Sequence, residues 1–151
     1  MMQRRLVLGL LAAFGLGACS IPSVEGDAQR ATEATALYTY LVEGRDDALL
    51  ARMSSDNDPA TVRVQLPMIR TFAPAGPAPE PKSLGWRSDA STNGQRYSLA
   101  QEYEYPDRFV RTDTTFLKEG ASWKVESFNV NARMKPAAAA AAPSAAPSAP
   151  P

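Results

Sequence analysis

The stretch RYSLAQEYEY, Arg96–Tyr105, alternates polar side chains with apolar or aromatic ones over most of its length. Successive side chains of a β-strand point to opposite faces, so a period of two predicts a half-buried strand. One face is charged or small. The other face, which we expect to pack against helices, carries Tyr97, Leu99, Gln101, Tyr103 and Tyr105.

Three further stretches around it have the same period of two. They are LGWRSDA from Leu84, FVRTDTTFL from Phe109 and SWKVESFNV from Ser122. The connections contain the turn-forming pairs Asn93-Gly94, Pro106-Asp107 and Glu119-Gly120. Because connections this short join antiparallel neighbours, we expect a four-stranded antiparallel meander.

The residues before the sheet have a helical period instead. Asp27 is a candidate helix cap, and Gly44 is a candidate stop. Between them, apolar residues recur at spacings of three and four, namely Ala31, Ala34, Leu37, Tyr38, Leu41 and Val42. This pattern predicts one long amphipathic helix whose apolar face packs on the sheet.

Two shorter helices are predicted after it. The first starts at Asp46 or Asp47 and carries Leu49, Leu50 and Met53. Asp58-Pro59 is typical of an N-cap followed by the first residue of a third helix. The TVRV stretch that follows alternates like a strand, and Pro67 favours a kink or an end. The fold class is therefore α+β, with N-terminal helices packed on the meander in one domain, residues 26–134.

In the last predicted strand the apolar side chains change face. Trp123 and Val125 have one parity, and Phe128 and Val130 have the opposite one. Either both faces of this strand are covered, or a β-bulge near Ser127 re-aims the chain. We favour the bulge.

Helices followed by such a meander resemble the cystatin-like and nuclear transport factor 2-like superfamily of small α+β cones. The resemblance spans most of residues 27–132, and its closing motif consists of Gly120, Trp123, Lys124, Val125, Phe128 and Val130. It implies a curved sheet around a long helix, with a cavity that some members use as an active site. The histidine of the dehydratase-type members has no counterpart here, so their chemistry is not carried over. The carboxylate base of an isomerase of this fold cannot be aligned either.

A small-ligand pocket on the concave sheet face is one hypothesis that follows. If Leu117 faces the core, then Phe109, Arg111 and Asp113 point the same way, and a few polar groups join an aromatic-lined space. The candidate pocket consists of Tyr97, Gln101, Tyr103, Tyr105, Arg111, Asp113 and Trp123. The alternative is that the tyrosines are core packing and that Arg111 and Asp113 form a solvated cross-strand pair.

The N-terminus has the layout of an export signal. Arg4 and Arg5 precede an apolar run that is too short to cross a bilayer, and small residues precede Cys19. Leu16-Gly17-Ala18-Cys19 resembles the lipobox of bacterial lipoproteins, which implies cleavage after residue 18 and a lipidated Cys19. An ordinary secretory signal is the alternative. In that family Ser20 favours the outer membrane over the inner one.

Composition excludes several classes of site. The chain has no histidine, and Cys19 is its one cysteine. Ser-His-Asp and Cys-His catalysis and the usual zinc sites are therefore absent, and we expect no cofactor. Asp56-Asn57-Asp58 lacks the later glycine and glutamate of a calcium loop. Basic residues are scattered among acids, so we expect no nucleic-acid partner.

At the other end, residues 136–151 contain only alanine, proline and serine, and we expect a disordered tail. The expected organisation is a signal peptide (1–18), a lipidated tether (19–25), the α+β domain (26–134) and the tail (135–151). Our interpretation is a lipid-anchored, periplasm-facing envelope protein that is a non-catalytic interaction or accessory module, with an envelope protein or the cell wall as possible partner. A small-ligand binding protein is the first alternative, and an enzyme of the nuclear transport factor 2-like type is the second.

Overall fold

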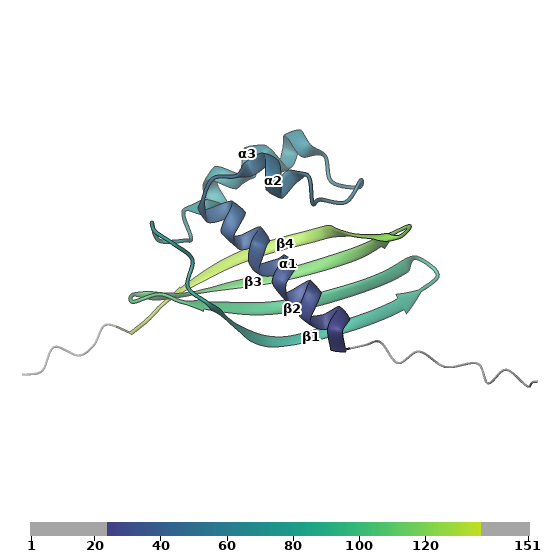
Figure 1. Ribbon diagram of the computed structural model, residues 1–151. Helices are drawn as coiled ribbons and strands as arrows, with labels where there is room; N and C mark the ends of the chain where they lie inside the picture. Colours follow the sequence, from purple (N-terminus) through teal and green to yellow (C-terminus); the bar gives the residue numbers. More distant parts are fainter. Residues whose placement is uncertain (1–23, 137–151) are drawn as a thin grey trace, which may run out of the picture.

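The computed structural model describes residues 24–136, including the side chains of residues 28–136. Three helices precede a four-stranded antiparallel sheet whose strands lie side by side in chain order, which confirms the predicted α+β class and the meander. Figure 1 shows the long helix lying across one face of the sheet. The predicted signal peptide, Cys19 and the tail from residue 137 lie outside the described residues.

The helices are α1 (Val24–Val42), α2 (Asp46–Leu50) and α3 (Pro59–Arg70). Helix α1 begins three residues before the cap predicted at Asp27. Asp58 caps α3 as expected, because its carboxylate accepts hydrogen bonds from the N–H groups of Ala60 and Thr61. Helix α3 contains the TVRV stretch and continues through Pro67, so the strand-like pattern forms no strand and the helix does not end at Pro67.

The strands are β1 (Pro81–Ser91), β2 (Gly94–Glu104), β3 (Arg108–Glu119) and β4 (Ser122–Met134). Each is longer than the alternating stretch that predicted it, at one end or both. Antiparallel partners that lie directly opposite share a face, and the register pairs Tyr97 with Phe116 and Tyr103 with Val110. These four side chains are buried in the core.

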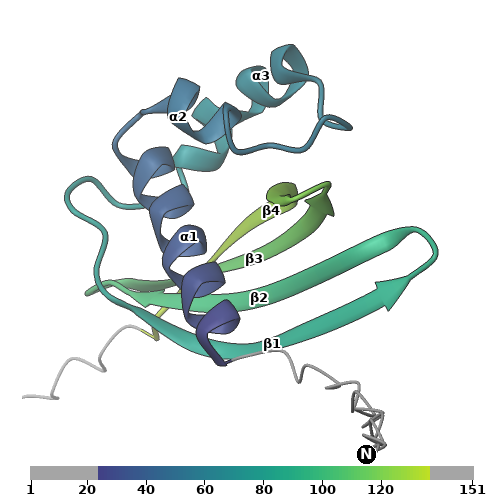
Figure 2. The same cartoon turned by 45° about the vertical axis from the view of Figure 1, so that its right-hand side comes forward.

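Helices α2 and α3 lie beyond the β4 edge, as the turned view in Figure 2 shows. The segment between them joins that edge through a parallel bridge between Met53 and Val125. Ser54 donates its N–H to the carbonyl of Val125 at 2.8 Å, and the N–H of Val125 donates to the carbonyl of Arg52 at 2.8 Å. Part of the β4 edge is thus covered by the chain itself.

Strand β4 contains the predicted bulge. Thr115 pairs with Ser127 while Phe116 pairs with Val125, so Glu126 is the extra residue. One inserted residue reverses the parity of everything after it. Trp123 and Val125 therefore pack on the same side of the sheet as Phe128 and Val130.

The core is one cluster between α1, the shorter helices and the concave sheet face. Helix α1 contributes four of the residues predicted for its apolar face, and Ala31 and Val42 pack at the margin. The buried apolar residues are Ala34, Leu37, Tyr38, Leu41, Leu49, Leu66, Tyr97, Leu99, Tyr103, Tyr105, Val110, Phe116, Val125 and Val130.

Candidate functional site

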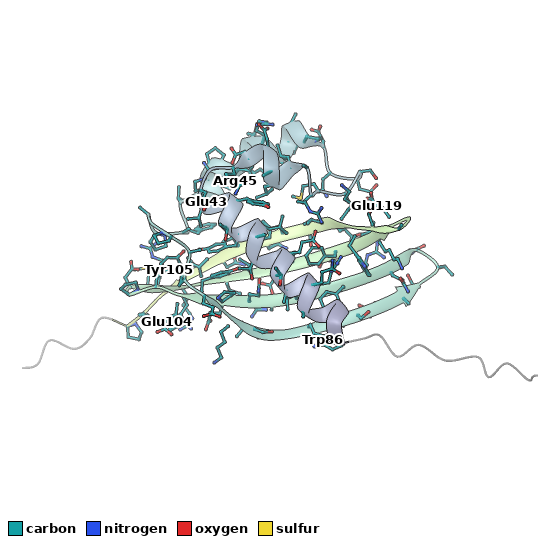
Figure 3. All side chains as sticks on the ribbon, viewed as in Figure 1. Glu43, Arg45, Trp86, Glu104, Tyr105 and Glu119 are labelled. Atoms are coloured by element: carbon teal, nitrogen blue, oxygen red, sulfur yellow. The ribbon has the colours of Figure 1, made fainter. Side chains whose placement is uncertain are left out.

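The predicted tyrosine face exists, and α1 covers it. Tyr97, Gln101, Tyr103 and Tyr105 share one side of the sheet, and none is more than 6% exposed. Tyr105, labelled in Figure 3, lies just after the end of β2. The alternation in RYSLAQEYEY thus predicted the correct inward face.

The polar atoms of Tyr38, Gln101 and Tyr103 and the hydroxyl of Tyr105 hydrogen-bond within this face and to α1. The hydroxyls of Tyr38 and Tyr105 form a hydrogen bond of 2.9 Å. Gln101 donates to the hydroxyl of Thr35 at 3.0 Å and accepts from the hydroxyl of Tyr103 at 3.4 Å. The rings of Tyr38 and Tyr103 stack with centroids 3.9 Å apart. This is a packed polar layer within the core.

Burial sets the chemistry of these tyrosines. Burial raises the pKa of Tyr38 well above its ordinary value, and the hydrogen bond between its hydroxyl and that of Tyr105 adds to that shift. Burial likewise raises the pKa of Tyr103. Both hydroxyls therefore stay protonated throughout the physiological range, and neither supplies a phenolate for general-base chemistry.

Arg111 and Asp113 lie on the opposite, convex face, so the prediction that they point with the tyrosines was wrong. The register pairs Gln101 with Thr112, and this pairing turns the even-numbered residues of β3 inward. Arg111 donates to the carboxylate of Asp113 at 2.7, 3.0 and 3.1 Å. The two residues form an ion pair within one strand, and this pair raises the pKa of Arg111.

Trp123 is on the concave side, but its neighbour is a buried arginine. The guanidinium of Arg30, a residue 7% exposed, lies 5.5 Å from the Trp123 ring centroid and 5.8 Å from that of Phe116. Its partner in an ion pair is Glu33, at 3.4 Å, and Glu33 also pairs with Arg52. Burial lowers the pKa of Arg30, and the charge of Arg52 adds to that effect.

Sequence reasoning missed Arg30, although a signal was available. Arg30 precedes Ala34 by four residues and Leu37 by seven, so it lies on the inward stripe of α1. Its long side chain crosses apolar surface and its guanidinium stacks over two aromatic rings, as arginine can do in a core. The predicted set is therefore divided between a core layer, an aromatic cluster with Arg30 and the convex face.

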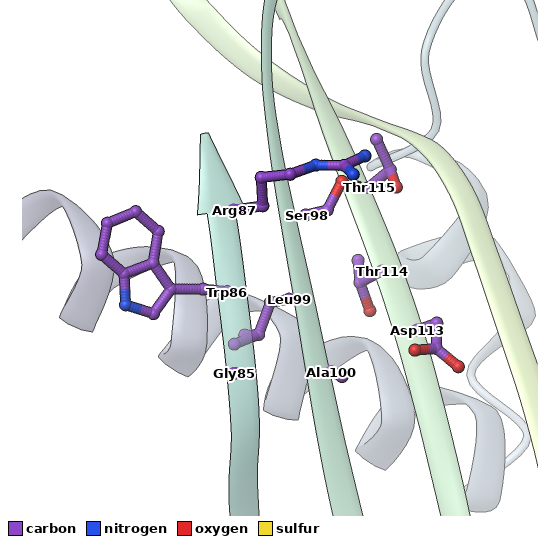
Figure 4. A pocket seen from close by; sticks show the side chains of 9 residues that line it. All are labelled: Gly85, Trp86, Arg87, Ser98, Leu99, Ala100, Asp113, Thr114 and Thr115. Atoms are coloured by element: carbon purple, nitrogen blue, oxygen red, sulfur yellow. Dashed lines mark hydrogen bonds between the residues drawn. The ribbon is translucent and has the colours of Figure 1, made fainter. Parts of the chain in front are cut away.

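One open depression of about 200 Å³ crosses β1, β2 and β3, and Figure 4 shows its lining. Gly85 and Ala100 leave it hollow because their side chains are small or absent. The hydroxyls of Ser98 and Thr115 lie 3.1 Å apart, and Arg87 extends over Ser98. Asp113 is in the lining, where Arg111 neutralises it. Its walls also hold serine and threonine hydroxyls, and the carboxylate of Asp113 accepts its hydrogen bonds from Arg111.

Residues 28–136 contain no cluster of three or more acidic or cysteine side chains that is placed to hold a metal ion. Within residues 24–136, none of the helices combines the length and apolar character needed to span a bilayer. Comparison of the chain with family models, curated proteins and solved structures finds no match. The resemblance to the cystatin-like and nuclear transport factor 2-like superfamily stays a prediction.

Proposed function

We propose that this protein is a non-catalytic interaction or accessory module of the bacterial cell envelope, held on a membrane by a lipidated Cys19. The packed concave face carries the non-catalytic part of the proposal. Where a ligand-binding cone would hold its cavity, Tyr38, Tyr103 and Gln101 contact one another and α1. A ligand would have to displace these contacts, which favours the interaction module over the small-ligand alternative.

The anchor rests on the sequence Leu16-Gly17-Ala18-Cys19. Two or three acyl chains hold a protein stably on a bilayer, whereas a single chain binds reversibly. Helix α1 starts at Val24, close behind that cysteine, so the proposal keeps the domain near the membrane surface. Ser20 favours the outer membrane, with the domain facing the periplasm.

Cys19→Ser tests the anchor. We expect the variant to accumulate as an unprocessed precursor or as a soluble product, and Ser20→Ala is the matched control that retains the cysteine. Fractionation of membranes and the mass of the mature N-terminus are the readouts. Normal processing and membrane association of Cys19→Ser would refute the lipid anchor.

The interaction role is tested in the cells that make the protein. The full chain and a version ending at Lys135 are crosslinked in vivo, purified under denaturing conditions and identified by mass spectrometry. We expect a specific partner with the full chain, and its loss on truncation would assign the contact to the tail. If neither version captures a partner while a small molecule co-purifies with the uncrosslinked chain under native conditions, the ligand-binding alternative replaces this proposal.

A further inference from the structure

Strand β1 forms a long open edge of the sheet. Figures 1 and 2 show it at the side away from α2 and α3, and within residues 24–136 it pairs with β2 alone. All of its residues after Pro81 are exposed. Every second residue of such an edge directs its N–H and C=O outward, where another strand can pair with them.

The second half of this edge is regular. A bulge at Leu84 interrupts the pairing with β2 between Ser83 and Gly85, and Gly85 has a φ of 145°. From Gly85 to Ser91 the register with β2 runs without a shift. This segment, GWRSDAS, is about as long as a typical β-strand. It is long enough to accept a partner strand.

The segment is self-complementary in charge. Arg87 and Asp89 lie on the convex face and form an ion pair of 2.9 Å. In an antiparallel pair with a two-fold axis at Ser88, Arg87 of each copy lies opposite Asp89 of the other. A two-fold axis at Arg87 or at Asp89 would instead oppose like charges, which is destabilising.

The concave side of the same register also fits. Trp86 lies opposite Ala90 of the other copy, so a large ring faces a methyl group. In the single chain this ring stacks on Tyr97 with centroids 5.6 Å apart and remains 54% exposed, and Figure 3 labels it at the open edge. A second strand would cover part of this apolar surface, and such burial favours association.

We propose that β1 is a homodimerisation edge, at which two copies pair antiparallel about Ser88 and join their sheets into one. A two-fold contact uses the same patch on both copies, and the Arg87/Asp89 pair meets that requirement. A strand from an unrelated protein would carry this complementary charge order only by coincidence. This inference is independent of the proposed function, since self-association requires neither the lipid anchor nor another partner.

Disulfide trapping tests the register. In the purified full chain, Ser88→Cys places two thiols opposite each other, and mild oxidation yields a covalent dimer. Ser91→Cys is the matched control, because its counterpart lies about 20 Å away along the strand at 3.4 Å per residue. Equal trapping of both variants, or trapping of neither above the level that Cys19 gives in the parent chain, would overturn the proposed register.

Charge reversal tests the partner. Arg87→Asp makes the segment acidic and Asp89→Arg makes it basic, so each variant alone should self-associate at least about tenfold more weakly than the parent chain. Mixing the two variants should restore association, and the doubly reversed chain should dimerise like the parent. Sedimentation in detergent measures the association of the parent chain, the two single variants, their mixture and the doubly reversed chain. Circular dichroism checks that each chain is folded. A monomeric parent chain, or a mixture no tighter than its components, would overturn the proposal.

Discussion

The side chain of Asn57 hydrogen-bonds to the main chain of the β4 bulge. This bulge keeps all the apolar side chains of β4 from Trp123 to Val130 on the concave face. Its side-chain nitrogen lies 3.2 Å from the carbonyl oxygen of Val125 and 3.1 Å from that of Glu126. It also donates to the hydroxyl of Ser54 at 3.0 Å. A bulge disrupts the regular ladder, so a donor supplied from the loop before α3 satisfies main-chain oxygens at this point.

Asn57→Ala removes these hydrogen bonds. Two bonds to main-chain carbonyls at about 1 kcal/mol each predict a loss of about 2 kcal/mol in the free energy of unfolding. For a domain of this size that loss lowers Tm by roughly 8 °C. The amide nitrogen of Asn57 carries only two hydrogens, so its contact with the hydroxyl of the buried Ser54 shares one of them and adds little to that figure.

Asn57→Asp is the sharper substitution, because it keeps the shape and replaces the donor by a carboxylate that faces two carbonyl oxygens. We expect a larger loss of stability at pH 7 than with alanine. Such a carboxyl has a raised pKa in the folded state, so its deficit shrinks as the pH falls toward the ordinary aspartate value of about 3.9 and below. Asn57→Ala should show no such recovery.

Urea denaturation followed by far-ultraviolet circular dichroism measures these losses. Asn129→Ala is the control, since Asn129 is an exposed asparagine on the convex face of the same strand. Its effect should stay within about 0.5 kcal/mol. If Asn57→Ala is no more destabilising than Asn129→Ala, the loop does not brace the bulge and this reasoning fails.

Three further predictions follow from burial and charge. Leu37→Ala, at a fully buried position of α1, should cost about 2–5 kcal/mol in thermal or urea unfolding, whereas Val64→Ala on the exposed side of α3 should cost under about 0.5 kcal/mol. Hydrogen bonds from Thr61 and from the α3 backbone lower the pKa of Asp58, so its contribution to stability is present above about pH 4 and is lost as the pH falls through the lowered value. The Tm gap between the parent chain and Asp58→Ala should therefore narrow in acid. Arg111→Ala and Asp113→Asn should leave Tm unchanged. A large drop in the Tm of either variant would contradict the placement of these side chains on the convex face.

The fold followed from periodicity because its elements switch cleanly from a helical period to a period of two. The change of face between Val125 and Phe128 was itself informative, since only an inserted residue keeps both apolar pairs on one side. Asp58-Pro59 predicted a helix start from local chemistry alone. These features depend on residues that are neighbours in the sequence, which is why the sequence alone predicts them.

The local sequence of β3 does not predict which of its two faces is buried. Phe109 and Leu117 have one parity while Val110 and Phe116 have the other, so apolar content does not choose between the faces. The choice is made by the register across the β2–β3 turn, which pairs Tyr103 with Val110. The pocket hypothesis assumed the wrong face and so placed Arg111 and Asp113 with the tyrosines, whereas the alternative of a solvated pair left them outside the core.

Residue-resolved titration of the tyrosine hydroxyls tests the closed concave face, which is the central claim. Each ring carbon that bears the hydroxyl is followed by carbon-13 NMR in the full chain from pH 8 to pH 12, with the chain in urea as reference. Because burial raises the pKa values of Tyr38 and Tyr103, their signals should stay at the protonated position until the fold is lost, and stability should fall as the pH rises above about 10. Reversible ionisation of either hydroxyl near pH 10 in the folded protein would mean that water enters this face, and it would contradict the account.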